Sequence, residues 1–149
     1  MGCENDTKVI IGGLLKLTLL DFPEHLACTV FLQGCNFRCP FCYNSSLIVN
    51  NNQSNYQISE QEFFDFLATR KGKLDGVAIT GGEPLWQKGI KQFIIRIREM
   101  GFKIKLDTNG SYPERLKELI DEKLIDYVAM DVKNSFDKYG LTSGNNFIL

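Results

Sequence analysis

The chain has 149 residues, of which 44% are hydrophobic and 11% are aromatic, so it can bury a core and does not have the composition of a disordered protein. Its 17 Lys and Arg residues nearly balance 18 Asp and Glu residues, for a net charge of −1. Because there is no basic surplus to bind phosphates, we expect no nucleic-acid partner. The length excludes a closed eight-stranded α/β barrel, which needs about 250 residues.

The sequence carries no basic run followed by an apolar run, as a signal peptide would. No apolar stretch approaches the roughly 20 residues of a membrane-spanning helix. We therefore expect a cytoplasmic protein that is independent of membranes, with residues 1–149 forming a single domain.

The predicted elements alternate along the chain between strands and helices. In chain order they are a β-like run at 9–17 (a strand or hairpin), a strand at 28–32, a polar loop at 50–55, a helix at 59–70, a strand at 76–80, a helix at 90–100, a strand at 102–106, a helix at 113–124 and a strand at 127–130. The four strands after residue 27 are short, apolar and rich in β-formers, as in a parallel sheet covered on both faces. Ser59 and Glu62 form a capping box at the start of the first helix. Residues 135–149 show no clear element.

Strand–helix alternation of this kind predicts an α/β fold of parallel βαβ units with right-handed crossovers. Polar or glycine-rich residues follow each of the four parallel strands directly, at 33–35, 81–84, 107–110 and 131–133. The carboxyl ends of parallel strands meet at one rim of a sheet, where α/β folds place their active sites. We expect these four segments to form one functional site.

Three of the five cysteines, Cys35, Cys39 and Cys42, lie within eight residues. An odd number of clustered cysteines indicates metal or redox chemistry more than a disulfide framework. Three thiolates favour an iron–sulfur cluster with one iron left open to a substrate. The alternatives are a structural zinc site, completed by His25, Cys3 or Cys28, and a chance grouping.

The segment at 35–42, CNFRCPFC, resembles the signature of the radical S-adenosylmethionine (radical SAM) superfamily. The GGEPL at 81–85, the DTNG at 107–110 and the GLLKLTLLDFP at 13–23 narrow the resemblance to the glycyl-radical-enzyme activases. Within these, the chain is most similar to the activating proteins of anaerobic ribonucleoside-triphosphate reductase. The resemblance covers roughly residues 9 to 142 and implies a partial (βα) barrel of about four parallel βα units.

The resemblance implies two cofactors, a [4Fe–4S] cluster held by Cys35, Cys39 and Cys42, and S-adenosylmethionine chelated by the fourth iron. In such enzymes an electron from the cluster cleaves S-adenosylmethionine to methionine and a 5′-deoxyadenosyl radical. In an activase that radical takes hydrogen from a glycine of the partner enzyme. The implied partners are anaerobic ribonucleotide reductase, which receives the glycyl radical, and a reduced flavodoxin or ferredoxin as electron donor.

Three residues after the second parallel strand match the superfamily's site for the methionine amino group, Gly81, Gly82 and Glu83. Glycines let backbone approach a ligand closely, and a carboxylate accepts from an ammonium. The alternative is a glycine turn with a helix-capping glutamate. Phe41, just before the last cysteine, is expected to stack near the adenine or only to pack.

The resemblance further implies that Asp107, Thr108 and Asn109 contact the methionine or ribose of the cofactor, directly or through a cation. The alternative is an Asx-type turn with Asn109 at its corner. Asp131 and Lys133 match an Asp-x-Lys of activases, where the lysine pairs with the methionine carboxylate or only with the aspartate.

Two departures from the family pattern affect these expectations. Tyr43 stands where these activases commonly carry histidine, which puts any role of that histidine in doubt. The chain has about four βα units where its relatives usually have six, so we expect a domain shortened at its C-terminus. Alternatives are another radical SAM enzyme (a pyruvate formate-lyase activase type or one acting on a small molecule) and a truncated protein that binds a cluster without turnover.

Overall fold

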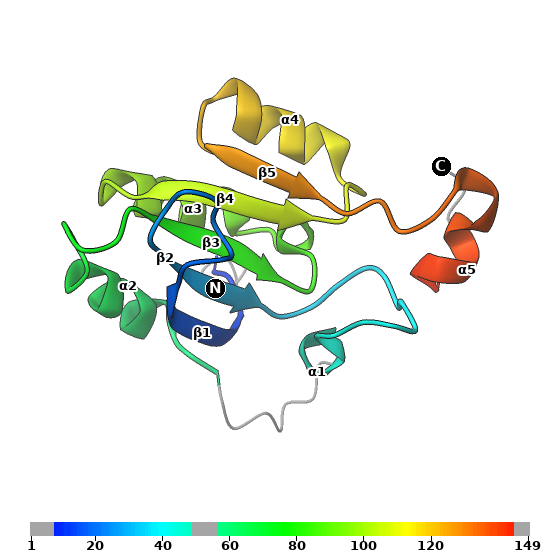
Figure 1. Cartoon of the computed structure of the whole chain (residues 1–149), viewed down its shortest axis with the longest axis horizontal. Coiled ribbons are helices and arrows are strands. Elements are labelled where there is room, and N and C mark those ends of the chain that lie inside the picture. The colour runs from blue at the N-terminus through cyan, green and yellow to red at the C-terminus, as the bar shows by residue number, and fades with distance from the viewer. Residues whose placement is uncertain (1–7, 49–56, 145–149) are drawn as a thin grey trace, which may run out of the picture.

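The computed structural model describes residues 8–48 and 57–144, so the predicted loop at 50–55 and the thiol of Cys3 lie outside the described residues. Within them the chain forms one five-stranded sheet of order β1-β2-β3-β4-β5 (Figure 1). The strands are β1 (Ile11–Thr18), β2 (Ala27–Leu32), β3 (Gly76–Gly81), β4 (Lys103–Thr108) and β5 (Tyr127–Met130). β1 pairs antiparallel with β2, and the other neighbours pair parallel. This confirms the α/β fold and its four parallel strands, and of the two possibilities for the segment before them the structure has a single strand, β1.

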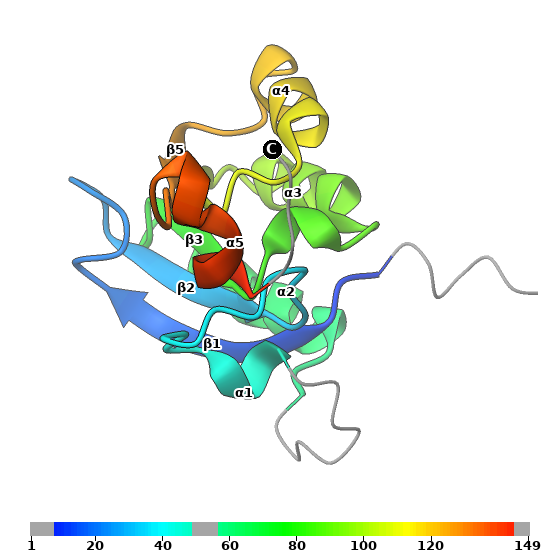
Figure 2. The ribbon, with the colours of Figure 1, turned by 90° about the vertical axis from the view of Figure 1, so that its right-hand side faces the viewer.

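The three longer helices lie along one face of the sheet, as Figure 2 shows. They are α2 (Glu60–Ala68), α3 (Ile90–Glu99) and α4 (Pro113–Asp121). Their apolar stripes meet alternate residues of the parallel strands in one buried core, which includes Val30, Val77, Ile79, Ile104 and Leu106 from the sheet and Phe63, Leu67, Phe93, Ile94, Ile97 and Leu119 from the helices. The parallel pairing of β2, β3, β4 and β5 brings all four strand ends to one rim.

The predicted helix starts and strand positions agree with the structure to within a few residues. Ser59 caps α2 as predicted, since its Oγ accepts from the Glu62 N–H at 3.1 Å and its own N–H donates to Glu62 Oε2 at 2.8 Å. No helix among the described residues is both long enough and apolar enough to span a membrane.

The third of the four parallel strands, β4, extends beyond its predicted end. The expected strand stopped at residue 106 and left Asp107 and Thr108 in a loop, whereas both belong to β4. They pair with Ala129 and Met130 of β5. Ladder hydrogen bonds to the neighbouring strand therefore extend β4 into a segment whose polar sequence favours a turn.

Residues 135–149 were expected to lack a clear element; residues 145–149 lie outside the described residues, and this prediction is wrong for residues 135–144. They form the 3₁₀ turn η3 (Phe136–Lys138) and the short helix α5 (Tyr139–Ser143). Tyr139 packs edge-on against Phe37 with ring centroids 6.2 Å apart, and the Arg38 N–H donates to the Ser143 carbonyl at 2.6 Å. Because these contacts come from the cysteine loop, the local sequence alone does not reveal the helix.

Candidate active site

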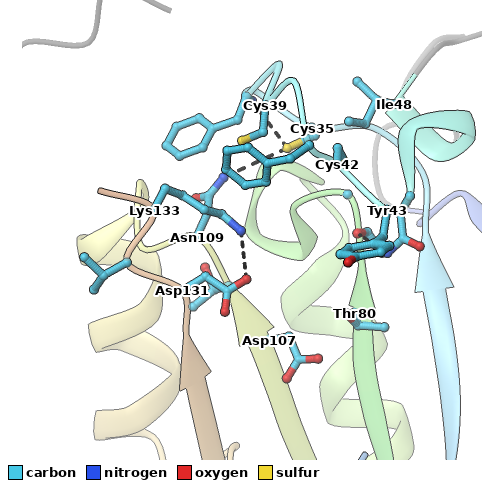
Figure 3. Close-up of a pocket in the computed structure, with 17 residues that line it drawn as sticks. Cys35, Cys39, Cys42, Tyr43, Ile48, Thr80, Asp107, Asn109, Asp131 and Lys133 are labelled. Atoms are coloured by element: carbon cyan, nitrogen blue, oxygen red, sulfur yellow. Dashed lines mark hydrogen bonds and ion pairs between the residues drawn. The ribbon is translucent and has the colours of Figure 1, made fainter. Parts of the chain in front are cut away.

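A cavity of about 460 Å³ opens at the carboxyl ends of the parallel strands (Figure 3). It lies between the loop that follows β2, the short helix α1 (Ser45–Ile48) and the segments that follow β3, β4 and β5. Its walls are formed by Cys35, Phe37, Cys39, Phe41, Cys42, Tyr43, Asn44, Ile48, Thr80, Gly81, Gly82, Asp107, Thr108, Asn109, Asp131, Val132 and Lys133. The four polar segments expected at one rim are therefore together.

The three clustered thiols all line this cavity, and all three cysteines are partly buried. Burial raises the pKa of Cys35, although the Phe37 N–H opposes the shift. Burial also raises the pKa of Cys39, against the attraction of the nearby Lys133 ammonium. These two groups therefore carry their protons at neutral pH until a metal displaces them.

The three sulfurs suit an iron–sulfur cluster better than a single ion. Within residues 8–48 and 57–144, no three His, Cys, Asp or Glu side chains are placed to hold one metal ion. A [4Fe–4S] cluster makes no such demand, because each of its cysteine sulfurs binds a different iron. Cys35, Cys39 and Cys42 on one cavity wall therefore fit the cluster.

Two of the residues considered as a fourth zinc ligand, His25 and Cys28, do not line the cavity. His25 lies before β2, at the opposite end of the strand, where its Nδ1 contacts the Pro23 carbonyl and its Nε2 contacts Lys103 Nζ, each at 2.8 Å. Cys28 is fully buried in the core of the sheet, and burial raises its pKa to about 12. Neither side chain faces the other cysteines.

The glycines after β3 allow two loops to touch. Gly82 donates its N–H to the Leu32 carbonyl and Glu83 donates its N–H to the Gly34 carbonyl, both at 2.9 Å. A Cβ added to Gly82 would lie 1.9 Å from the Gly34 oxygen. Gly81 has φ +126°, and a Cβ there would lie 2.2 Å from the Leu32 oxygen. Only glycine permits this approach of the β3 loop to the cysteine loop.

Glu83 is fully buried, and its carboxylate points to the end of β4, where Thr108 and Asn109 form part of the cavity wall. Oε1 accepts from the Thr108 hydroxyl at 2.7 Å and from the Leu85 N–H at 3.1 Å, and Oε2 accepts from the Asn109 N–H at 2.7 Å. Burial raises its pKa, and these three hydrogen bonds oppose the rise. The capping interaction foreseen as the alternative is present, because Glu83 caps the 3₁₀ turn η2 (Pro84–Trp86).

Asp107, Thr108 and Asn109 all reach the cavity wall from the end of β4. Lys105 Nζ lies 2.6 Å from Asp107 Oδ1 as an ion pair, and this buried oxygen accepts no hydrogen bond from the part of the chain that the structure describes. Asn109 Oδ1 accepts from the Ser111 N–H at 3.0 Å, which is the Asx-type turn named as the alternative.

The segment after β5 supplies a charged pair. Lys133 Nζ lies 2.8 Å from Asp131 Oδ2 (Figure 3). Burial by itself would lower the pKa of Lys133. The hydrogen bond to Asp131 and the negative charge of Asp131 outweigh this effect, so the pKa is raised. Phe41 and Tyr43 reach the cavity from the cysteine loop and remain largely exposed, Tyr43 completely.

The sequence did not identify several residues that build this site. Thr80 was placed in a strand without a role, yet period-two alternation puts its side chain on the same face as Asp107, and both line the cavity. Asn36 and Ser111 join the two loops by a 2.9 Å hydrogen bond from the asparagine amide to the serine hydroxyl. Nothing in the local sequence indicates that pair.

Comparisons with known proteins agree with this arrangement. The family model described as "Radical SAM superfamily" matches residues 29–145. The chain is 41% identical over 136 residues to a Methanocaldococcus jannaschii protein provisionally named as a glycyl-radical enzyme activating enzyme, covering 89% of this chain and 53% of that protein. It is 32% identical over 68 residues to the anaerobic ribonucleoside-triphosphate reductase-activating protein of Escherichia coli, covering 45% of this chain and 44% of that protein.

The fold has a solved counterpart in the crystal structure of QueE from Escherichia coli, with a TM-score of 0.51 and 20% identity. That alignment covers 69% of this chain and 53% of the other. The chain thus spans about half the length of these relatives.

Proposed function

The chain belongs to the radical SAM superfamily, and from this premise we propose that it activates a glycyl-radical enzyme. Membership implies two cofactors, a [4Fe–4S] cluster and S-adenosylmethionine. When bound, they supply one-electron cleavage of the sulfonium and the abstraction of a hydrogen atom. The resemblance to the Methanocaldococcus jannaschii protein supports an activase within the superfamily.

The observation that carries the proposal is the position of the three thiols. Cys35, Cys39 and Cys42 line one cavity with charged groups from β4 and from the segment after β5. Thiolates are the ligands that iron–sulfur clusters use, and carboxylates and an ammonium suit a zwitterionic amino acid such as the methionine part of the cofactor. The cavity therefore offers both donor sets side by side.

We assign the remaining cavity residues to the cofactor's methionine and nucleoside. Lys133 is proposed to bind the methionine carboxylate, with Asp131 holding the ammonium group of Lys133 in place. Asp107 and Thr108 are proposed to contact the methionine or the ribose. Phe41, exposed at the cavity mouth, is proposed to lie against the adenine.

Glu83 and the glycines before it are proposed to serve the methionine amino group. A carboxylate has about four acceptor positions, and protein donors occupy three of those of Glu83. The carboxylate is fully buried in this structure, so we propose that its fourth position becomes reachable for the ammonium group when the cofactor binds. Gly81 and Gly82, which line the cavity, bring the backbone close to this point.

The finer proposal is that the protein substrate is anaerobic ribonucleotide reductase. It is supported by the similarity to the Escherichia coli activating protein of that enzyme and by the sequence motifs at 13–23 and 81–85. A reduced flavodoxin or ferredoxin is proposed as the electron donor. Tyr43, fully exposed beside the last cysteine, is available to contact such a partner.

The test is an anaerobic reconstitution with iron and sulfide, followed by addition of a reductant and S-adenosylmethionine. We expect 5′-deoxyadenosine as product and, with anaerobic ribonucleotide reductase present, a glycyl-radical EPR signal on the reductase. The Cys39→Ala variant serves as the negative control, because it lacks one of the three proposed cluster ligands.

Two results would contradict different parts of the proposal. An intact cluster with no 5′-deoxyadenosine would identify a cluster-binding protein without turnover. Formation of 5′-deoxyadenosine without a radical on the reductase, but with one on pyruvate formate-lyase, would reassign the partner while leaving the radical SAM chemistry in place.

A further inference from the structure

A closed ring of hydrogen bonds joins the cysteine loop to the loop that follows β4. Asn109 Nδ2 donates to Asn36 Oδ1 at 3.1 Å, Asn36 Nδ2 donates to Ser111 Oγ at 2.9 Å, and Ser111 Oγ donates to Asn109 Oδ1 at 2.6 Å. Each of the three side chains gives and receives one hydrogen bond within the ring. Such a ring fixes the rotamers of all three groups together.

The ring also determines which end of the Asn109 amide faces the cysteines. Its Oδ1 accepts from both the hydroxyl and the backbone N–H of Ser111, so the oxygen must point toward Ser111. The NH₂ group then faces the cysteine loop. One of its hydrogens is used by Asn36, and the other is directed at Cys35 Sγ, 4.0 Å from Nδ2, as Figure 3 shows.

The backbone of Asn109 is held as firmly as its side chain. Its N–H donates at 2.7 Å to the carboxylate of Glu83, which is fully buried. Cys35 Sγ meanwhile accepts a second donor, the Phe37 N–H, at 3.3 Å. Two N–H groups therefore face the sulfur of Cys35. One is the backbone N–H of Phe37 in the same loop, and the other belongs to the side-chain amide of Asn109, whose backbone is held by Glu83 at the end of β4.

We propose that Asn109 is a positioning residue whose amide N–H, oriented by Asn36 and Ser111, raises the reduction potential of the cluster that Cys35 binds. Reduction adds negative charge to a cluster and its sulfurs, so an N–H donor stabilises the reduced state more than the oxidised state. The inference rests on the cluster-binding part of the proposed function and is independent of the protein substrate.

The experiment compares midpoint potentials of anaerobically reconstituted proteins, followed by the EPR signal of the reduced cluster during a mediated redox titration without S-adenosylmethionine. The variants are Asn109→Ala, which removes the donor, and Asn109→Asp, which keeps the shape of the side chain and replaces the donor by an acceptor. We expect both to shift the potential to more negative values, Asn109→Asp further because it adds a negative charge.

Two further variants separate a donor effect from a change in cavity polarity. Ser111→Ala keeps the Asn109 amide but releases its orientation, so we expect a smaller shift of the same sign. Asn44→Ala removes an asparagine amide from the same cavity wall, one that donates to the Gly81 carbonyl at 3.3 Å. We expect it to leave the potential at the wild-type value.

Iron and sulfide content is measured first, which distinguishes failure of the inference from failure of the proposed function. If both Asn109 variants hold a full cluster at the wild-type potential, the inference is overturned and cluster binding stands. An equal shift in Asn44→Ala also overturns it, because polarity then explains the effect. A wild-type chain that binds no iron and sulfide overturns both.

Discussion

The hydroxyl of Thr108 donates a 2.7 Å hydrogen bond to Glu83 Oε1, and both residues are buried. The bond ties the segment after β3 to the end of β4 and leaves a carboxylate buried beneath the cavity. Since a buried carboxylate without donors would be costly to ionise, Thr108 and the N–H groups of Leu85 and Asn109 stabilise its charged form.

Burial nevertheless raises the pKa of Glu83 above its ordinary value of 4.5, and the chain should therefore lose stability as pH rises. The folded chain holds the Glu83 proton more tightly than the unfolded chain, so this contribution is complete below pH 4.5 and is lost as pH rises through the raised pKa. The Glu83→Gln variant has no such proton. We expect its free energy of unfolding to improve relative to wild type as pH rises.

Urea unfolding of both proteins from about pH 4 to about pH 7 measures this difference. A difference between the two proteins that stays constant over the range, or that moves in favour of wild type with rising pH, would contradict the buried position of the carboxylate.

Replacing a cavity cysteine should remove the cluster, whereas replacing the core cysteine should not. We expect Cys39→Ala to lose bound iron and sulfide after reconstitution, because three thiolates are the proposed ligands. Cys28→Ala removes a thiol of the buried core and should lower stability by about 1 kcal/mol while keeping its iron. Iron and sulfide analysis with the visible absorbance spectrum checks both.

Equal iron loss in a folded Cys28→Ala protein would show that the ligand set is wrong. Retention of a full cluster by Cys39→Ala would lead to the same conclusion.

A methyl group at Gly82 should force the two loops apart. The added Cβ, whose position is fixed by the backbone of residue 82, would lie 1.9 Å from the backbone carbonyl oxygen of Gly34, so the loops must shift. We expect Gly82→Ala to cost about 2 kcal/mol in unfolding free energy and to weaken cluster retention. Gly13→Ala is the matched control, since its nearest neighbour would lie 3.7 Å away in ordinary contact.

Thermal unfolding and the rate of iron loss to a chelator measure the two effects. The close approach of the loops would be dispensable if Gly82→Ala behaved like Gly13→Ala in both assays.

The ion pair between Lys105 and Asp107 should contribute more to the free energy of unfolding than an exposed ion pair does. Lys105 is buried, and within residues 8–48 and 57–144 the buried Oδ1 of Asp107 has the Lys105 ammonium as its ion-pair partner and no hydrogen bond, so Lys105→Met leaves that oxygen unpaired while the rest of the Asp107 side chain stays partly exposed. We expect a loss of about 2 kcal/mol in unfolding free energy. Lys117→Met breaks the exposed pair with Asp121 and should cost less than about 0.5 kcal/mol.

Chemical denaturation of both variants checks the comparison. Equal losses would mean that the cavity side of the sheet is as well solvated as the surface of α4.

The sequence by itself determined the α/β class, the four parallel strands and the rim on which the cysteines lie. These follow from local information. Short apolar runs predict buried strands, and parallel strands bring the polar segments that follow them to one rim of the sheet. The capping box at Ser59 and the helix beginning at Pro113 depend on neighbours within one turn, so they too could be predicted.

Only the tertiary structure decided how the rim residues are used. Thr108 was expected in a loop but belongs to β4, because its partner is Met130. The carboxylate of Glu83 is buried against Thr108 and does not itself line the cavity. Helix α5 forms against Phe37. The Asn109 amide faces Cys35 because a hydrogen bond from Ser111 orients it. Each of these depends on groups more than 20 residues apart or on the packing of two loops, and such contacts leave no periodicity or spacing in the local sequence.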